Sequence, residues 1–458
     1  MTKPLSFLKY LKFHNIRDRL IYLKWYSFLE KSQWWSKEEN DLYQWQKVKI
    51  LLNYSYNNIP YYNELLSKMG ATPEDFKTWA DFRKIPYLKK EIVRERQTDF
   101  VPGNIKNLKK LKYCTTSGST GMPLEFFRFN QDDVIENAFM NNQWSRVGYE
   151  ENCSRVILRG GTLPNNKLFL RQRFSNNWLL SSYYLSEKYI KQYIDLLNQV
   201  NPDFFHVYPS SLYIFTQLLL DSKLTLNFYP KAILCGSEPV FDYQRSLFES
   251  TYKTRVYSWL GLAEGTILAG ECEYSSSYHI WPQYSYVELI DDNNLLINEK
   301  GTTASIVGTS FNNLCTPFIR YKCDDRAMYG ADQCNLCGRK HLILEKIESR
   351  KHYILILNDG TEFPLTALHY NIDRFDSMKH IKDIQLVQKT KGKLIIRINA
   401  LSSYSLADES EIRKKICSSL NERLIVNFEY TDDFIKTKGG KNIFFLQNIK
   451  RELDLDKY

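Results

Sequence analysis

The sequence predicts an α/β protein with a large N-terminal body of parallel or mixed sheets and helices, followed by a smaller α+β domain. One stretch predicts a βαβ unit, with a buried strand at 231–235, a helix at 242–253 and a second strand at 255–259. Such a unit places its two strands parallel in one sheet. A chain of 458 residues is several times the length of a typical domain. We expect a boundary between domains 1–348 and 349–458, where the pattern of elements changes.

Helices and one short strand are expected before the βαβ unit. Apolar side chains favour helix over 37–70, up to and beyond the Asn-Ile-Pro-Tyr-Tyr break at 58–62. Segments 187–200 and 210–222 are also typical of helices, and the second follows a proline that can start one. The alternation at 125–129 indicates a strand.

The C-terminal region has a different order of elements. A hairpin is predicted at 381–398, with its turn at Lys391-Gly392. A helix at 408–420 and a strand at 424–430 follow. This order predicts a small α+β domain.

Composition excludes several classes of protein. With 43% hydrophobic and 25% charged residues, the chain is neither disordered nor collagen-like. It contains no apolar run of the ~20 residues needed to cross a bilayer, and no secretion signal is recognisable. Nine scattered cysteines do not resemble a secreted disulfide framework. We therefore expect a cytoplasmic protein.

The net charge of +10 favours anionic small molecules or a membrane surface over nucleic acid as partners. Much of the excess lies in residues 1–31, where basic and apolar side chains alternate. This segment could be a basic amphipathic helix lying on the inner face of the membrane. The alternative is a helix packed on the body with a solvated basic face.

The segment 113–124 is rich in glycine and hydroxyl side chains. Its loop residues are Thr116, Ser117, Gly118, Ser119, Thr120 and Gly121. Backbone N–H groups and hydroxyls of such a loop can bind phosphate oxygens. No Gly-Lys pair follows and the next residues favour a strand, which excludes a Walker A loop. On these residues alone, an ordinary Ser/Gly turn fits equally well.

Further motifs follow this loop in order: Gly-Ser-Glu-Pro at 236–239, Gly-Leu-Ala-Glu at 261–264, Arg-Tyr-Lys-Cys-Asp-Asp at 320–325 and Thr-Lys-Gly-Gly-Lys at 437–441. With them the chain resembles the adenylate-forming superfamily, and within it the phenylacetate-CoA ligase family. The match is with its CapK-like branch, which is associated with capsular polysaccharide biosynthesis. The resemblance runs from Asn58 to Lys441 and covers nearly the whole chain.

The resemblance implies a role for each matching residue. The loop 116–121 would bind the phosphates of ATP. Adenine would contact Gly236, Ser237 and Glu238, and the ribose would contact Asp325. The motif that begins at Gly261 would bind Mg²⁺ through its glutamate, Glu264. Arg350 would lie in the hinge between the domains, and Lys441 would be the catalytic lysine of a mobile C-terminal lid.

The implied reaction is that of an AMP-forming ligase. A carboxylic acid attacks the α-phosphate of ATP, pyrophosphate leaves, and the acyl group passes from the acyl-adenylate to an acceptor. The acceptor would be CoA, a carrier thiol or a sugar amine, in capsular or surface polysaccharide biosynthesis. Glu264 with its magnesium, and Lys441, would stabilise the charge that develops on the phosphate oxygens.

Several positions depart from the family's pattern: Leu260, Ala263, Asp324, Ser349 and Tyr353. Relatives usually have tyrosine, threonine, glycine, glycine and aspartate at these places. The alternative function is therefore a nucleotide-binding scaffold that has lost turnover.

Cysteines at 334 and 337 form a Cys-x2-Cys pair that can present two thiolates to one ion. The resemblance adds Cys272 and His279, since some relatives carry structural zinc at matching positions. Because protein atoms would fill all four places, the zinc would be structural. The alternatives are buried free cysteines or a zinc knuckle that binds nucleic acid. Basic residues are not concentrated around this pair, which disfavours nucleic acid.

Two smaller features stay open. His206, near Tyr208-Pro-Ser, could line an acyl pocket or be a hydrogen-bonded structural histidine. Lys89 and Lys90 match a basic element of the family but could equally form a solvated face.

Overall fold

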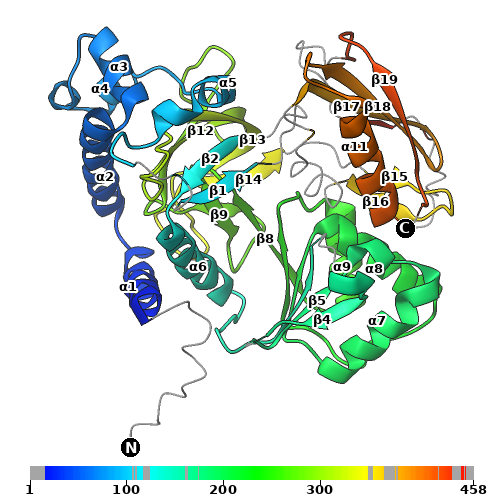
Figure 1. Ribbon diagram of the computed structural model, residues 1–458. Helices are drawn as coiled ribbons and strands as arrows, with labels where there is room; N and C mark the ends of the chain where they lie inside the picture. Colours follow the sequence, from blue (N-terminus) through cyan, green and yellow to red (C-terminus); the bar gives the residue numbers. More distant parts are fainter. Residues whose placement is uncertain are drawn as a thin grey trace, which may run out of the picture.

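The computed structural model describes residues 16–105, 108, 111–116, 124–159, 163–173, 175–348, 354–365, 377, 380–420, 422–435, 445–447 and 449. Most strands join one large mixed sheet: β3 (Arg155–Leu158), β4 (Phe169–Arg171), β5 (Asn177–Leu180), β6 (Phe204–Val207), β7 (Ala232–Gly236), β8 (Arg255–Gly261), β9 (Leu268–Glu271), β10 (Tyr278–Ile280), β11 (Ser285–Ile290), β12 (Thr303–Ser310), β13 (Tyr321–Ala331) and β14 (Ile343–Glu348). Their order across the sheet is β11-β12-β13-β14-β10-β9-β8-β7-β6-β3-β5-β4. The predicted α/β class is confirmed (Figure 1).

One half of this sheet is parallel. Strands β5, β3, β6, β7 and β8 pair in parallel in that order. Helices α7 (Glu187–Val200), α8 (Pro209–Asp221) and α9 (Asp242–Tyr252) pack against this half, and their apolar side chains form a core with it. The predicted βαβ unit is confirmed as β7, α9 and β8, and the helices predicted at 187–200 and 210–222 are α7 and α8.

A second core lies between the sheet and α6 (Asn130–Ser145), with α1 (Ile16–Ser32) beside α6. Tyr22 and Leu29 of α1 are buried there, and Asn141 of α6 donates a 2.9 Å hydrogen bond to the Tyr22 hydroxyl. The described part of segment 1–31 is therefore a helix packed on the body. Residues 1–15 lie outside the described residues, so the expected membrane contact stays a prediction. Within the described chain, every helix is too short or too polar to span a bilayer.

The other half of the sheet, from β9 to β11, is antiparallel. Against it lie α2 (Lys37–Asn58), α3 (Pro60–Lys68), α4 (Trp79–Phe82) and α5 (Lys90–Glu95). The helix predicted over 37–70 is divided at Ile59, which is extended because a proline follows it. A separate hairpin joins β1 (Lys112–Thr115) to β2 (Glu125–Arg128), which confirms the predicted strand.

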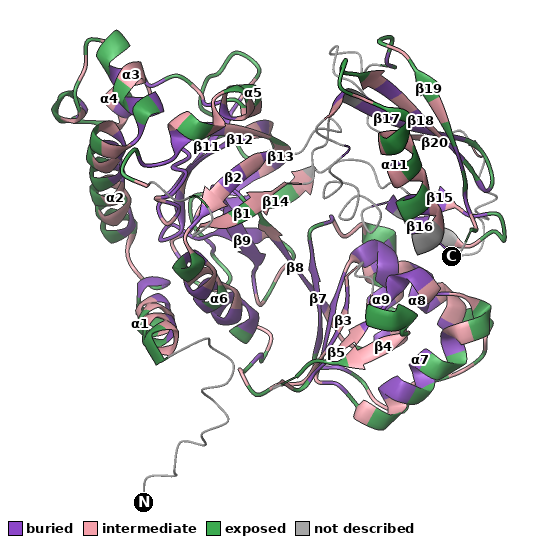
Figure 2. Ribbon diagram, viewed as in Figure 1, coloured by how far each residue is buried: buried purple, intermediate pink, exposed green. Residues whose placement is uncertain are grey.

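The C-terminal region forms its own four-stranded sheet, ordered β19-β18-β17-β20. It contains β17 (Ile381–Thr390), β18 (Lys393–Ala400), α11 (Leu406–Ser419), β19 (Ile425–Tyr430) and β20 (Phe445–Gln447), which confirms the hairpin, helix and strand predicted there. The short pair β15 (Ile354–Ile356) and β16 (Glu362–Pro364) shares its core. Buried residues alternate with less buried ones along β18 (Figure 2). The boundary at 348/349 stays a prediction, because residues 349–353 lie outside the described part.

The C-terminal sheet contacts the body through Tyr183. This tyrosine is buried in the core of the C-terminal region, with its ring 5.1 Å from that of Phe363. Arg423 donates a 2.8 Å hydrogen bond to the backbone carbonyl of Tyr183. The two regions therefore share a small buried contact beside α8 and α9.

Candidate active site and metal centre

A tight turn between β8 and β9, where the parallel and antiparallel halves of the sheet meet, carries Glu264. Gly265 closes this turn with a φ of +73° and donates a 2.9 Å hydrogen bond to the carbonyl of Leu262. The Glu264 side chain points inward: it is 6% exposed, and the Tyr321 hydroxyl donates a 3.1 Å hydrogen bond to its Oε1. The sequence therefore places a carboxylate inside the protein at the end of a sheet strand.

Other charges surround this carboxylate. Burial raises the pKa of Glu264, the nearby Asp325 adds to the rise, and Lys90 and the Tyr321 hydroxyl oppose it. Lys90 is brought close because the backbone of Leu88 pairs with the start of β13: its N–H donates to the Arg320 carbonyl and its carbonyl accepts from Lys322, both at 3.0 Å. Glu264 is thus under the electrostatic influence of a second carboxylate and one ammonium group. Carboxylate oxygens are the ligands that Mg²⁺ prefers, and Glu264 offers one such group.

The loop predicted to bind phosphate joins β1 to β2. Thr116 and Leu124 close its base, with the Thr116 N–H donating to the Leu124 carbonyl at 2.9 Å and the Leu124 N–H to Thr116 Oγ1 at 3.2 Å. The predicted residues Ser117, Gly118, Ser119, Thr120 and Gly121 lie outside the described residues. So do Ser349, Arg350, Tyr353, Lys438 and Lys441.

The predicted adenine loop follows β7. A Cβ atom on Gly236 would lie 2.2 Å from the indole of Trp259, so only glycine fits there. Ser237 is exposed and has a φ of +66°. The buried Glu238 carboxylate accepts 2.9 Å hydrogen bonds from the backbone N–H and the hydroxyl of Ser210, in the first turn of α8. Its carboxylate therefore holds this loop to the start of that helix.

Arg159, to which sequence reasoning assigned no role, joins His206 and Ser237 in a cluster at the carboxyl ends of β3, β6 and β7. Arg159, just after β3, places its Nη1 3.0 Å from His206 Nε2 and donates from Nη2 to Ser237 Oγ at 2.6 Å. His206 packs against the rings of Trp144 and Trp259, which also contact each other. Burial, with Arg159 and Arg155 nearby, holds the pKa of His206 well below its usual value, so the imidazole is neutral. The one available signal was the position of Arg159 directly after a buried strand.

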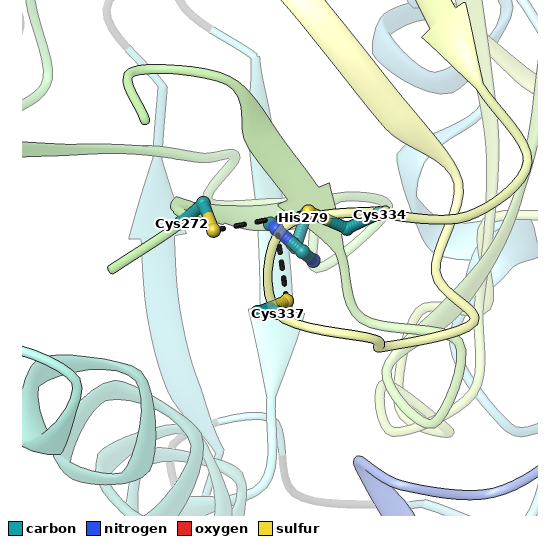
Figure 3. Close-up of side chains that lie close together, drawn as sticks. All are labelled: Cys272, His279, Cys334 and Cys337. Carbon is teal, nitrogen blue, oxygen red and sulfur yellow. Dashed lines mark hydrogen bonds between the residues drawn. The ribbon is translucent and has the colours of Figure 1, made fainter. Parts of the chain in front are cut away.

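The predicted metal ligands come together at the other end of β9 (Figure 3). Cys272 follows β9, His279 lies on β10, and Cys334 and Cys337 lie in the connection between β13 and β14. One ligand atom from each lies within 4.8 Å of all the others. Cys272 Sγ is 3.8 Å from Cys334 Sγ, and Cys337 Sγ is 3.8 Å from His279 Nε2.

This spacing fits zinc. Ligands about 2.0 to 2.3 Å from a tetrahedral zinc lie about 3.5 to 3.8 Å from one another. Burial lowers the pKa of His279 to about 2, so its imidazole is neutral, as a ligand must be. Burial raises the pKa of Cys272 to about 12, whereas backbone N–H groups of Cys337 and Leu336 overcome burial and lower that of Cys334.

The Cys-x2-Cys connection is also held to the rest of the protein. Gly338, with a φ of +84°, donates to the Cys334 carbonyl at 3.0 Å, and the Cys334 N–H donates to the Arg339 carbonyl at 2.9 Å. The Arg339 guanidinium binds Glu273 through both carboxylate oxygens, at 2.7 and 2.8 Å, and Gln33 at 3.0 Å. Arg339 therefore holds the Cys-x2-Cys connection to the turn after β9 and to the link between α1 and α2.

Comparison with known proteins gives the relationships of the chain. No protein-family model matches it. It is 23% identical over 434 residues to protein CapK of Staphylococcus aureus, a match covering 90% of this chain and 91% of CapK. It is also 23% identical over 416 residues to phenylacetate-coenzyme A ligase of Escherichia coli K12, covering 85% of this chain and 89% of the ligase. The chain is a homologue of CapK and the phenylacetate-coenzyme A ligases.

Solved structures show the same fold for this homologue of the ligases. A 2-hydroxyisobutyryl-CoA ligase in complex with 2-HIB-AMP and CoA aligns with a TM-score of 0.59 at 15% identity, covering 91% of this chain and 92% of the ligase. The same ligase in a postadenylation state aligns with a TM-score of 0.57 at 17% identity. The fold is therefore that of an adenylate-forming CoA ligase.

Proposed function

We propose that the protein is an AMP-forming ligase that activates a carboxylic acid with ATP and transfers the acyl group to CoA or another acceptor. The observation that carries this proposal is homology to ligases along nearly the whole chain, together with their fold. The buried Glu264, with Tyr321, Asp325 and Lys90 around it, gives the proposal a chemical site.

Each group has a role in this proposal. ATP would lie across the carboxyl ends of the parallel strands, where open α/β sheets bind ligands. The base of the β1–β2 loop, held by Thr116, presents residues 117–121 to the phosphates, and Asp325 binds the ribose. Since the Glu238 carboxylate is held by Ser210, adenine would contact the backbone of Gly236 and Ser237.

Magnesium would be held by Glu264. When bound, it supplies positive charge that stabilises the phosphate oxygens. The chain's own contribution is to keep that carboxylate oriented: the Tyr321 hydroxyl fixes one oxygen, and the tight Gly265 turn fixes the backbone. Lys441 would add an ammonium group from the C-terminal region and, with Arg350 at the hinge, leave after adenylation.

The metal centre has a separate role in the proposal. Cys272, His279, Cys334 and Cys337 would hold one structural zinc, because protein atoms supply all four ligands. The strand β9 separates this centre from Glu264 by roughly 13 Å, too far for direct contact with the same phosphate. Its function would be to fix the turn after β9 against the β13–β14 connection.

The proposal also covers the acyl acceptor and the biosynthetic role of the product. CoA is the acceptor named in the ligases that share the fold, and a carrier thiol or a sugar amine are the alternatives. The relation to CapK supports a role in capsular or surface polysaccharide biosynthesis only through that protein's name.

The test is pyrophosphate release from ATP and Mg²⁺ by the purified full chain, screened against aryl, fatty, amino and hydroxy acids. We expect release that requires both the metal and one class of acid. A protein that binds ATP and releases no pyrophosphate with any acid would contradict the proposal and support a scaffold that has lost turnover.

A further inference from the structure

Arg159 is a half-buried cation that has no carboxylate partner among the described residues. Its hydrogen bonds within the described chain go to neutral groups, the His206 imidazole and the Ser237 hydroxyl. A guanidinium has five N–H donors, and these two bonds use one donor each on Nη1 and Nη2. Both terminal nitrogens therefore have a further donor to offer a ligand.

Another arginine of the same protein shows how a purely structural guanidinium is satisfied. Arg320 binds both oxygens of Glu288 at 3.0 Å and donates to the carbonyls of Arg83 and Ile85. Arg159 has no carboxylate of this kind among the described residues, and its hydrogen-bond partners are an imidazole and a hydroxyl. Arg155, close enough to lower the pKa of His206, donates to Asn177 at 3.3 Å and also has no carboxylate partner among the described residues. Within the described chain, two cations therefore lie here without a paired carboxylate.

The surroundings of Arg159 suit an organic acid better than a nucleotide phosphate. The rings of Tyr208 and Trp259 lie 4.9 and 5.9 Å from its guanidinium carbon, and Trp144 packs on His206 behind them. Arg159 directly follows β3, and β3 lies three strands from β8, where the Glu264 turn begins. Three strand spacings are roughly 14 Å. The reacting phosphate and the acid would together fill the space between Arg159 and the Glu264 turn.

We propose that Arg159, with His206, binds a second oxygen group, a hydroxyl or carboxylate, at the end of the acid remote from the carboxylate that reacts. The inference rests on the proposed ligase function and narrows its substrate class to hydroxy acids and dicarboxylic acids. The guanidinium donates to that oxygen, and the aromatic rings contact the carbon chain between the two ends. Plain acids lack the oxygen and leave the cation unpaired.

The test compares matched acids. The full chain is assayed by pyrophosphate release with butanoate, 4-hydroxybutanoate and succinate, and with phenylacetate, 4-hydroxyphenylacetate and 4-carboxyphenylacetate. We expect kcat/KM to favour the oxygen-bearing acid of the set that fits the pocket by about 10- to 100-fold. Arg159→Met keeps an unbranched side chain without charge and should lose that preference. Arg159→Lys keeps the charge and should retain part of it. Arg171→Met, on the exposed end of β4, is the matched control and should not alter the preference.

The outcomes are distinguishable. Wild-type protein that prefers the plain acids, or an Arg159→Met variant that slows all acids by one common factor, would overturn this inference while leaving the ligase function intact. Absence of pyrophosphate with every acid would overturn both. If Arg159→Met does not fold, judged by its thermal unfolding midpoint, Arg159→Lys decides. A reduced preference would support the contact between the guanidinium and the remote oxygen, and a preference equal to that of the wild type would overturn it.

Discussion

The two ends of β9 illustrate two kinds of site. At one end, Cys272, His279, Cys334 and Cys337 stand at the spacing that a tetrahedral ion sets, and each donor faces the others. At the other end, Glu264 is buried, and the Tyr321 hydroxyl donates a hydrogen bond to it. At the carboxyl ends of the parallel strands, Arg159 and His206 each have a polar atom without a partner among the described residues. The first arrangement is complete once an ion binds. The second is incomplete until larger ligands bind.

This difference separates stability from chemistry. A closed metal site contributes its binding free energy to folding, so its loss should unfold the protein. At the strand ends, charged and polar groups are buried, which itself reduces stability. Substitutions there should therefore change the rate of the reaction more than the free energy of unfolding. Substitutions in the metal centre and in the strand-end site should therefore have different effects.

The largest effect is expected at the metal centre. Cys334→Ser or Cys337→Ser removes one zinc ligand and should cost much of a binding free energy on the order of 10 kcal/mol. We expect insoluble protein or a strongly lowered unfolding midpoint, and loss of the one zinc per chain that metal analysis should find in wild-type protein. Cys153→Ser, at a half-buried cysteine outside the cluster, is the control. A metal analysis that finds no stoichiometric zinc in the wild-type protein would contradict the zinc site.

The next effect concerns Lys441, which lies outside the described residues. Lys441→Ala should slow acyl-adenylate formation roughly 100- to 1,000-fold, because one aimed donor to the developing charge is lost. Transfer of the acyl group from pre-made acyl-adenylate should be slowed far less. Single-turnover kinetics of each half-reaction measure this. If Lys438→Ala shows the defect and Lys441→Ala does not, the role moves by three residues.

A smaller effect is expected at Glu264. Glu264→Gln keeps the shape and removes the charge that would hold magnesium, so we expect turnover to fall on the order of 10- to 100-fold, with partial recovery at high Mg²⁺. The unfolding midpoint should not fall, because the charge of a buried carboxylate is itself costly. Glu299→Gln, at an exposed carboxylate, is the control. Equal Mg²⁺ dependence of Glu264→Gln and wild type would exclude the magnesium role.

The smallest effect is a pH dependence that His206 sets. Burial, with Arg159 and Arg155, lowers its pKa in the folded protein, so the unfolded chain binds a proton below about pH 6.5 that the folded chain does not. Stability is therefore present above that pH and is lost as the pH falls. His206→Gln should reduce the slope of unfolding free energy against pH by up to about 1.4 kcal/mol per pH unit. Equal slopes in denaturant titrations between pH 5 and 7 would contradict this.

Much of the fold could be predicted from local pattern. The βαβ unit at β7, α9 and β8 follows from two apolar runs around an amphipathic segment, and the hairpin at Lys391-Gly392 follows from its turn residues. The break predicted at Asn-Ile-Pro-Tyr-Tyr, 58–62, is found at Ile59, because the ring of Pro60 does not allow the preceding residue to be helical.

The candidate site was predicted where its motif is contiguous and missed where it is assembled by the fold. Glu264 and the cysteine pair stand in short motifs. Arg159 becomes a candidate site residue only through its contacts with His206 and Ser237, which are 47 and 78 residues away in sequence. Likewise Lys90 approaches Glu264 only because Leu88 pairs with β13. A single sequence does not encode those distances in any local pattern.

Formation of an acyl-adenylate by this chain can be measured through isotope exchange between pyrophosphate and ATP. Purified protein is given ATP, Mg²⁺, labelled pyrophosphate and an acid that supports pyrophosphate release, without any acceptor. Reversible adenylation predicts that label enters ATP only when the acid is present, and that the rate falls in Glu264→Gln. Entry of label into ATP without an acid would contradict the formation of an acyl-adenylate. So would a protein that binds ATP and exchanges no label with any acid.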